Sequence, residues 1–346
     1  MKYTTLPGTD IKVSKICLGT MTIGNQNTEA EGFDQMDLAL DSGVNFFDTA
    51  ELYPVPAEAK TQGETERVIG NWFKKTGNRS KVILASKAAG PGPYTAHIRN
   101  KVSFNKANLV EAVENSLKRL QTDYIDLYQL HWPERNTNYF GKRGYSHDAD
   151  DPWIENFEEI LHNLNELIQA GKIRQIGLSN ENPWAIMKYM ELSRKGLPKM
   201  ITLQNTYSLL TRHFEVGTAE VCLREDVGLL AYSPLAFGRL TGKYRNGNNP
   251  PKARFTLFPN FAARYNGKQA IEATELYFRI AQKHSLSLTQ MSLAFVNMQP
   301  FVTSNIIGAT TLEQLQENIG SINVTLSKEI LKEIETVQNQ LPNPAP

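Results

Sequence analysis

Several features that define large classes of protein are missing from this sequence of 346 residues. Only two cysteines are present, Cys17 and Cys222, with no Cys-x-x-Cys pair and no histidine at metal-binding spacing. A disulfide framework is therefore excluded, and the sequence has no pattern of zinc ligands. We expect a protein without a metal site that is suited to the reducing cytoplasm.

Long apolar runs and an excess of one charge are missing as well. No stretch approaches the roughly 18 apolar residues of a membrane-spanning helix, and the first residues lack the apolar core of a signal peptide. The 37 basic and 36 acidic residues leave a formal net charge of +1, which gives no field to attract nucleic acid or an acidic membrane. A small molecule is the expected partner, and the oligomeric state does not follow from composition.

A glycine-rich nucleotide-binding loop is also absent. The segment Gly90-Pro91-Gly92-Pro93 does not supply the Gly-x-Gly-x-x-Gly turn that a Rossmann domain places between a strand and a helix. The segment from Gly238 to Tyr244 is one residue short of a triphosphate-binding loop and carries Tyr244 where Ser or Thr would bind magnesium. A dinucleotide would therefore be bound by another fold.

Strand and helix patterns alternate along the whole chain. After a predicted hairpin over residues 3–14, short apolar runs and stretches with apolar residues at helical spacing follow each other seven or eight times. Right-handed crossovers between parallel strands would close these units into a (β/α)8 TIM barrel, an α/β fold. We predict a single domain over residues 1–346, with the hairpin at the barrel floor and added helices at 288–296 and 326–337.

The predicted strands cover residues 16–21, 44–48, 81–87, 124–131, 173–180, 201–207, 228–235 and 303–309. The predicted helices between them cover residues 29–41, 64–76, 108–120, 157–169, 183–194, 216–223, 270–284 and 312–320.

Three successive predicted strands end in ionisable side chains. Asp48 closes the apolar run after Gly43, the next strand ends in Lys87 and the third in His131, while Tyr53 follows Asp48 by five residues. Taken alone, Asp48 could merely cap the following turn. The carboxyl ends of barrel strands share one face, however, so all four side chains are expected to converge there.

These four side chains suit acid–base chemistry. Tyrosine, with a pKa of about 10, is a poor acid at neutral pH, and an ammonium about 4 Å away favours the phenolate by roughly 4 kcal/mol at an effective dielectric constant of about 20. We therefore expect Lys87 to lower the pKa of Tyr53, and Asp48 to keep Lys87 protonated despite burial. His131 is expected to hydrogen-bond the substrate oxygen, and its surroundings decide whether it is neutral or charged.

The same residues resemble the catalytic tetrad of the aldo-keto reductases. Leu18-Gly19-Thr20-Met21, followed by Asn45-Phe46-Phe47-Asp48-Thr49-Ala50, resembles the opening of that family. The resemblance covers the whole chain and is nearest to the bacterial Tas-like proteins, near the potassium-channel β-subunit branch, through residues 53–56, 131–133, 140–142 and 207–210. It implies that hydride passes from NADPH to an aldehyde or ketone carbonyl while Tyr53 donates the proton.

The resemblance also implies the residues that bind the cofactor. Ser179, Asn180 and Gln204 match positions that bond the nicotinamide carboxamide, and Tyr232 matches the aromatic ring stacked on the nicotinamide. Without the resemblance, Ser179 and Asn180 could cap the next helix and Tyr232 could be a core residue. The other implied cofactor positions are Thr20, Ser233, Pro234, Leu235, Ala236, Phe237, Gly238, Leu240, Gly242, Lys243, Tyr244, Arg254, Gly308, Thr310, Gln314, Glu317 and Asn318.

Two regions of the sequence are expected to bind the phosphate groups of the cofactor. Residues 308–318 have the pattern of a strand, a tight turn and a helix, whose first backbone amides can receive a phosphate at the usual barrel site. In the family, Lys243 and Arg254 lie near a ribose 2′-phosphate, and two cations there would favour NADPH over NADH. The alternative for both side chains is ordinary solvated surface.

Two other functions remain open from the sequence. A regulatory protein related to the channel β subunits would bind NADPH with little turnover. An aldolase or isomerase on the same barrel would use Lys87 as a Schiff base. The long loop over residues 133–153 directly follows His131, and we assign it to substrate contact.

Overall fold

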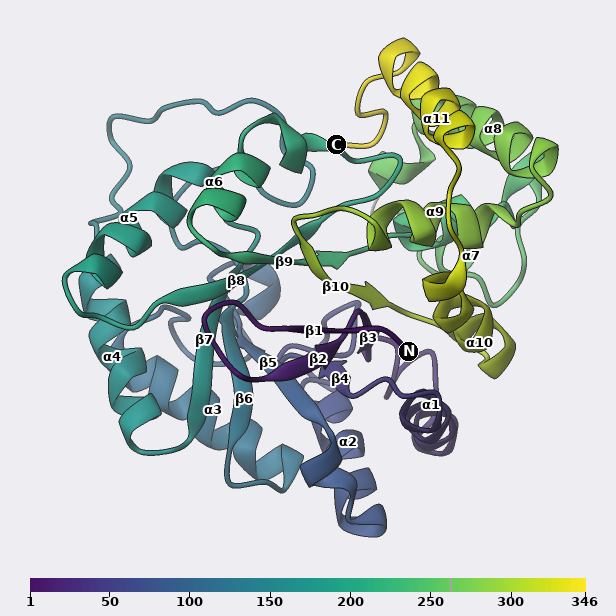
Figure 1. Cartoon of the computed structure of the whole chain (residues 1–346). Coiled ribbons are helices and arrows are strands. Elements are labelled where there is room, and N and C mark those ends of the chain that lie inside the picture. The colour runs from purple at the N-terminus through teal and green to yellow at the C-terminus, as the bar shows by residue number, and fades with distance from the viewer. Residues whose placement is uncertain (262) are drawn as a thin grey trace.

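Eight parallel strands close into a barrel in the order β10-β3-β4-β5-β6-β7-β8-β9 (Figure 1). The structure is a computed structural model that describes residues 1–261 and 263–346. Because strands that are neighbours in the barrel follow each other along the chain, the predicted (β/α)8 TIM barrel is confirmed. The barrel strands are Ile16–Gly19 (β3), Phe46–Asp48 (β4), Ile83–Ala88 (β5), Ile125–Leu130 (β6), Ile173–Ser179 (β7), Met200–Thr206 (β8), Gly228–Tyr232 (β9) and Val302–Ile307 (β10).

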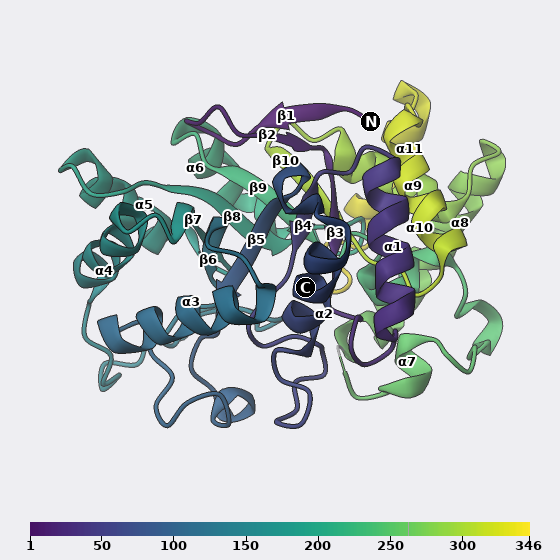
Figure 2. The same ribbon diagram turned by 90° about the horizontal axis from the view of Figure 1, so that it is seen from below.

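The helices surround this barrel (Figures 1 and 2). The last four helices gather on one side, where α11 lies beside α8 (Figure 1). None of the helices within the described ranges is long and apolar enough to cross a membrane. The helices are Glu29–Asp41 (α1), Glu64–Thr76 (α2), Lys106–Leu120 (α3), Phe157–Gln169 (α4), Pro183–Arg194 (α5), Thr218–Arg224 (α6), Arg254–Leu257 (α7), Lys268–Lys283 (α8), Leu288–Asn297 (α9), Leu312–Gly320 (α10) and Lys328–Gln340 (α11).

Local sequence explains where the strands and helices form. Strands β6 and β10 are buried at every position, as expected for parallel strands covered on both faces. Helix α1 begins with a capping box in which the Thr28 side chain accepts from the Glu31 amide and Glu31 accepts from the Thr28 amide. Helices α3 and α11 begin with side-chain caps from Asn105 and Ser327.

A two-stranded hairpin covers the amino-terminal end of the barrel, as predicted. Tyr3–Thr5 (β1) pairs antiparallel with Lys12–Ser14 (β2), and Figure 2 shows the hairpin across one end with α7 toward the other. Leu6 and Val13 pack with inward-facing strand residues that include Phe46 and Leu127. The hairpin therefore closes the floor, which leaves the carboxyl ends of the strands as the open face for chemistry.

The chain after β9 differs from the prediction. A strand was expected over 228–235, but β9 ends at Tyr232 because Ser233 has a positive φ of 54°. The next residues form a 3-10 segment over 236–241 that is interrupted by positive φ values at Phe237 and Gly238. The short helix α7 was not predicted either.

Candidate active site

The four side chains expected at the barrel mouth lie together. Asp48 is the last residue of β4, Lys87 is near the end of β5, His131 directly follows β6, and Tyr53 comes from the loop after β4. All four are buried, with exposed fractions of 0% for Lys87 and 8% for Tyr53. Residues from three neighbouring strands and one loop therefore form a single group.

Lys87 is the centre of this group. Its Nζ donates to Asp48 Oδ2 at 2.7 Å and to the Thr49 carbonyl at 2.8 Å, and it lies 3.4 Å from Tyr53 Oη. Burial disfavours the ammonium, but the Asp48 carboxylate and the Tyr53 hydroxyl together raise the pKa of Lys87 above its usual value. Lys87 is therefore charged at neutral pH, as expected from the sequence.

The pKa of Tyr53 differs from the expectation. Burial raises it above the usual value, Lys87 lowers it, and Asp48 raises it again. The expected net lowering was wrong because the ammonium is neutralised by a carboxylate that also faces the phenol, and because water is excluded from the hydroxyl. In this structure Tyr53 is a neutral phenol, which is the form that can donate a proton.

His131 is held as a neutral imidazole. Its pKa lies well below the usual value, first because it is buried and second because Lys87 is nearby. The imidazole packs against Trp132, with ring centroids 4.8 Å apart, and edge-on to Tyr53 at 5.8 Å. Within residues 1–261 and 263–346, its buried Nδ1 has no hydrogen-bond partner. The charge state left open by the sequence is therefore resolved in favour of the neutral form.

The neutral state of His131 predicts a pH dependence of stability. In the unfolded chain the His131 imidazole takes up a proton near pH 6.5, whereas in the folded chain it stays neutral at that pH. The contribution of neutral His131 to folding stability is therefore fully present above about pH 6.5. It is lost as the pH falls toward the pKa of His131 in the folded protein. We expect the melting temperature to fall more between about pH 7.5 and pH 5.5 in the parental protein than in His131→Gln. The exposed His162→Gln should behave like the parent, and equal slopes in all three proteins would contradict a neutral buried His131.

Gln204 and Asn180, both expected near the nicotinamide, form hydrogen bonds to this group, and Ser179 and Tyr232 bond to them in turn. Gln204 Nε2 donates to Asp48 Oδ1 at 2.8 Å, and Ser179 Oγ donates to the Gln204 carbonyl at 2.9 Å. Asn180 Nδ2 donates to the His131 carbonyl at 2.8 Å, and Asn180 Oδ1 accepts from Tyr232 Oη at 2.7 Å. These hydrogen bonds connect the residues to the barrel mouth, and their contact with a nicotinamide stays a prediction.

A family model described as "Aldo/keto reductase family" matches residues 15–339. The chain belongs to this family. It is 50% identical to Protein tas of Escherichia coli (strain K12) over an alignment of 348 residues that covers 100% of both chains. It is 31% identical to Aldo-keto reductase YhdN of Bacillus subtilis (strain 168), with 99% of this chain and 96% of that protein covered. It is also 31% identical to a probable voltage-gated potassium channel subunit beta of Arabidopsis thaliana, with 99% and 98% covered.

Membership of the aldo/keto reductase family confirms the resemblance seen in the sequence and supports an oxidoreductase. The alignments with the two bacterial relatives cover 100% and 99% of this chain. Aldo/keto reductases generally use a nicotinamide cofactor.

Two cationic side chains near the site, Arg254 and Lys243, have no carboxylate partner in the described parts of the chain. Arg254 donates to Gln26 Oε1 at 3.0 Å, and burial lowers its pKa to about 10. Burial and the nearby Arg254 also lower the pKa of Lys243. A Cβ added to Gly238 would lie 3.4 Å from the Lys243 side chain. Uncompensated positive charge of this kind fits a phosphate group.

The loop after β3 connects these cations to the start of α10. Asn27 Nδ2 donates to the Thr310 carbonyl at 3.0 Å, while Gln26 from the same loop bonds Arg254. A Cβ added to Gly308 meets no atom within 4 Å, so this turn faces open space. Glu317, another expected cofactor residue, accepts from the hydroxyl of Ser287, which caps α9.

Remaining expected positions fall in the same region. Thr20 Oγ1 donates to the Asp48 carbonyl at 2.8 Å, and Asn318 Nδ2 donates to the Gly308 carbonyl at 3.0 Å. Gln314 Oε1 accepts from both the amide and the hydroxyl of Thr310 at 3.1 Å. The other positions from Ser233 to Tyr244 lie on the interrupted 3-10 segment over 236–241 or within three residues of it, namely Ser233, Pro234, Leu235, Ala236, Phe237, Leu240, Gly242 and Tyr244.

Sequence reasoning missed a buried ion pair that holds the loop carrying Tyr53. Glu51 accepts from Arg99 Nη1 at 3.0 Å and Nη2 at 2.5 Å, and also from the Ala89 amide at 2.6 Å. Gln62 donates to the Glu51 carbonyl at 2.6 Å. The pair joins the loop after β4 to the loop after β5, and therefore fixes Tyr53 relative to Lys87. An acid two residues before Tyr53 was the only signal in the sequence.

A second missed pair anchors the loop over 133–153. Arg135 donates to both oxygens of Glu181, at 2.8 and 2.5 Å, and Asn182 donates to Thr137 and to the Asn138 carbonyl. The start of this loop is thereby attached to the residues that follow Asn180. Substrate contact by the loop stays a prediction.

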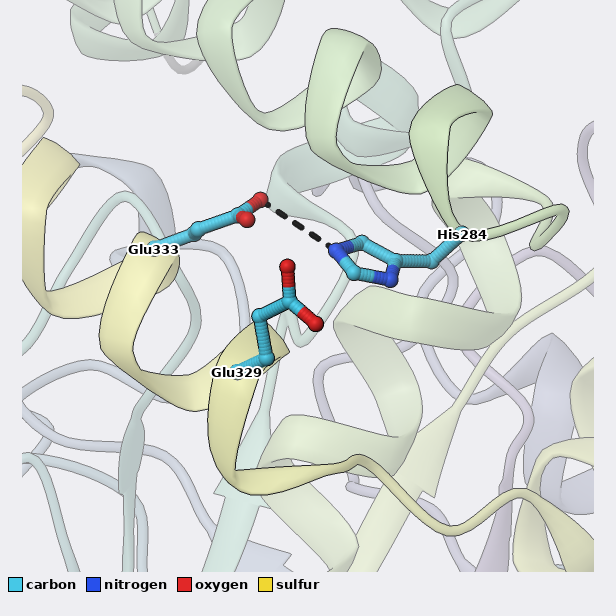
Figure 3. A group of neighbouring side chains, drawn as sticks. All are labelled: His284, Glu329 and Glu333. Atoms are coloured by element: carbon cyan, nitrogen blue, oxygen red, sulfur yellow. Dashed lines mark hydrogen bonds and ion pairs between the residues drawn. The ribbon is translucent and has the colours of Figure 1, made fainter.

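One group of side chains away from the barrel mouth has the composition of a metal site. Figure 3 shows His284, beyond the end of α8, with Glu329 and Glu333 of α11 pointing toward it. Lys283 Nζ donates to Glu329 at 3.0 Å and to Glu333 at 2.6 Å, so both carboxylates already have an ammonium partner. We interpret this group as an ion-pair contact between α8 and α11.

Proposed function

We propose that the protein is an NADPH-dependent reductase that converts an aldehyde or ketone to an alcohol at the barrel mouth. The observation that carries this proposal is the position of Lys87 Nζ between Asp48 Oδ2 at 2.7 Å and Tyr53 Oη at 3.4 Å. It places a neutral acid beside a permanent positive charge. When bound, NADPH supplies the hydride.

Each side chain has one task in this proposal. Tyr53 donates its phenolic proton to the carbonyl oxygen as that oxygen gains negative charge. Lys87 stabilises the phenolate that remains, and Asp48 keeps Lys87 protonated. His131, as a neutral imidazole, donates its one N–H to the carbonyl oxygen and orients the substrate. The burial of all four groups strengthens these interactions because water is excluded.

Cofactor binding is assigned to the residues around this group. Ser179, Asn180 and Gln204 would bind the carboxamide of the nicotinamide, and Tyr232 would stack on its ring. Gly308, Thr310 and the amides at the start of α10 would hold the pyrophosphate or adenosine end. Lys243 and Arg254 would bind the 2′-phosphate, which distinguishes NADPH from NADH.

Nucleotide preference tests this assignment. We expect NADPH to bind more tightly than NADH. Lys243→Gln and Arg254→Gln should each weaken NADPH binding by about tenfold or more, while the affinity for NADH should change little. Fluorescence titration measures both dissociation constants, and the exposed Lys252→Gln serves as a control. Equal affinities of the parental protein for the two nucleotides would contradict the assignment.

The reductase proposal itself is tested by turnover. We expect NADPH-dependent reduction of simple aromatic aldehydes such as 4-nitrobenzaldehyde, which is measured as the loss of NADPH absorbance. No consumption with any aldehyde or ketone of a broad panel would contradict it.

A second function is favoured by one comparison. The 31% identity to a probable voltage-gated potassium channel subunit beta extends over 99% of this chain. A regulatory protein of that kind would bind NADPH tightly and oxidise it very slowly. Tight binding combined with turnover no faster than in buffer would favour this alternative.

A further inference from the structure

A cavity separate from the barrel mouth lies between the chain after β9 and helix α8. Its volume is about 390 Å3, which is within the range of small-molecule sites. It is lined by parts of α7 and α8 and by the segment that joins β9 to them, on the side of the molecule where Figure 1 shows α7 and α8. None of the four side chains at the barrel mouth lines it, and of the positions assigned to the cofactor only Tyr244 does.

Arg239 gives this cavity an uncompensated positive charge. Its side chain is 7% exposed, and its Nε donates to the Tyr265 carbonyl at 3.0 Å while Nη2 bonds the Asn266 side chain. Both of these partners are neutral, and no carboxylate among residues 1–261 and 263–346 pairs with it. A buried guanidinium that has only neutral partners is suited to a ligand with negative charge.

The other arginine of the cavity is already neutralised. Arg245 Nε lies 2.9 and 3.0 Å from the two oxygens of Glu275, and Nη2 lies 2.8 Å from one of them. Because the Arg245 guanidinium occupies both oxygens of Glu275, this carboxylate has little capacity left to neutralise Arg239. The charge offered to a ligand is therefore that of Arg239.

The remaining wall is aromatic and apolar. The rings of Tyr244 and Phe255 lie 4.8 Å apart, and Arg239 Cζ is 5.2 and 5.3 Å from their centroids. Ile271 of α8 also lines the cavity and is 44% exposed, which places it at the rim. A flat apolar body can pack against the rings while its anionic group bonds the guanidinium.

We propose that this cavity is a second small-molecule site that binds an organic anion, in which a carboxylate or phosphate on a flat apolar body bonds Arg239. The site is separate from the one that reduces the carbonyl and is independent of the proposed reductase activity. Its specificity comes from one charge-assisted contact and one aromatic wall, so a neutral molecule of the same shape binds weakly.

Calorimetric titration of the full chain with phenyl phosphate and with benzoate tests the proposal, and benzyl alcohol is the neutral comparison. We expect at least one of the two anions to bind, and benzyl alcohol to bind much more weakly. The stronger anion identifies whether phosphate or carboxylate is preferred. Failure of both anions to bind, or equal binding of benzyl alcohol, overturns the proposal.

Three variants locate the bound anion. Arg239→Gln should weaken binding of the anion by about tenfold or more. Ile271→Trp, which narrows the rim of the cavity without changing a buried group, should weaken it to a similar extent. Lys243→Gln should leave the affinity unchanged, because Lys243 does not line the cavity. Unchanged affinity in Ile271→Trp, or loss in Lys243→Gln alone, overturns the proposal even if Arg239→Gln does not fold.

Discussion

Tyr53→Phe is expected to lower kcat for aldehyde reduction by about 10²–10⁴-fold, the usual contribution of a positioned general acid. The variant keeps the ring and its packing against His131, and it loses only the hydroxyl that lies 3.4 Å from Lys87 Nζ. The dissociation constant for NADPH and the melting temperature should change little. Steady-state kinetics with 4-nitrobenzaldehyde, together with a nucleotide titration, measures all three effects of this substitution.

Tyr3→Phe is the matched control for this substitution. Its hydroxyl donates to the Gly43 carbonyl at 2.9 Å in the hairpin region, at the opposite end of the barrel from the site. We expect parental kcat in this variant. If Tyr53→Phe also retains parental kcat, then Tyr53 is not the proton donor.

Lys87→Met is expected to remove both activity and stability. It takes away the charge that stabilises the Tyr53 phenolate, so kcat should fall at least as far as in Tyr53→Phe. Among residues 1–261 and 263–346, it also leaves Asp48, which is 2% exposed, with only the amides of Gln204 and Gln129 as side-chain partners. Removing one partner of a buried ion pair costs about 3–5 kcal/mol of unfolding free energy.

A double variant separates the two effects of Lys87→Met. In Asp48→Asn/Lys87→Met both charges are absent, so part of the lost stability should return while kcat stays low. Denaturant unfolding measures the stability, and Lys81→Met, at an exposed lysine just before β5, is the control. A single variant as stable as the parent would show that the Lys87–Asp48 pair contributes nothing to the fold.

The barrel and its four mouth residues were predictable because they depend on local patterns. Apolar runs closed by Asp48, Lys87 and His131 specify strands, and barrel topology then brings the strand ends together. The hairpin was predictable for the same reason, since its turn residues and the apolar Leu6 and Val13 lie within a few positions of each other.

Features that depend on distant contacts were not predictable. The partners Glu51 and Arg99 are separated by 48 residues, and Arg135 and Glu181 by 46, so no local pattern pairs them. The raised pKa of Tyr53 also escaped prediction, because desolvation depends on the packing of the whole barrel mouth.

The end of β9 was misplaced for a different reason. Apolar residues continue past Tyr232, which favoured a longer strand, but the backbone turns to positive φ at Ser233, Ala236 and Phe237. None of these is glycine or asparagine, so the residue types gave no sign of the left-handed conformation. The segment expected to hold the cofactor therefore has a backbone shape that only the structure reveals.

Stopped-flow oxidation of NADPH bound to the protein tests the central claim most directly, because it observes hydride transfer without product release. On mixing with 4-nitrobenzaldehyde, the parental protein should oxidise its bound NADPH far faster than buffer does, and Tyr53→Phe should do so about 10²–10⁴-fold more slowly. A parental rate equal to that in buffer, or equal rates in the two proteins, would contradict a reductase that uses Tyr53 as its acid.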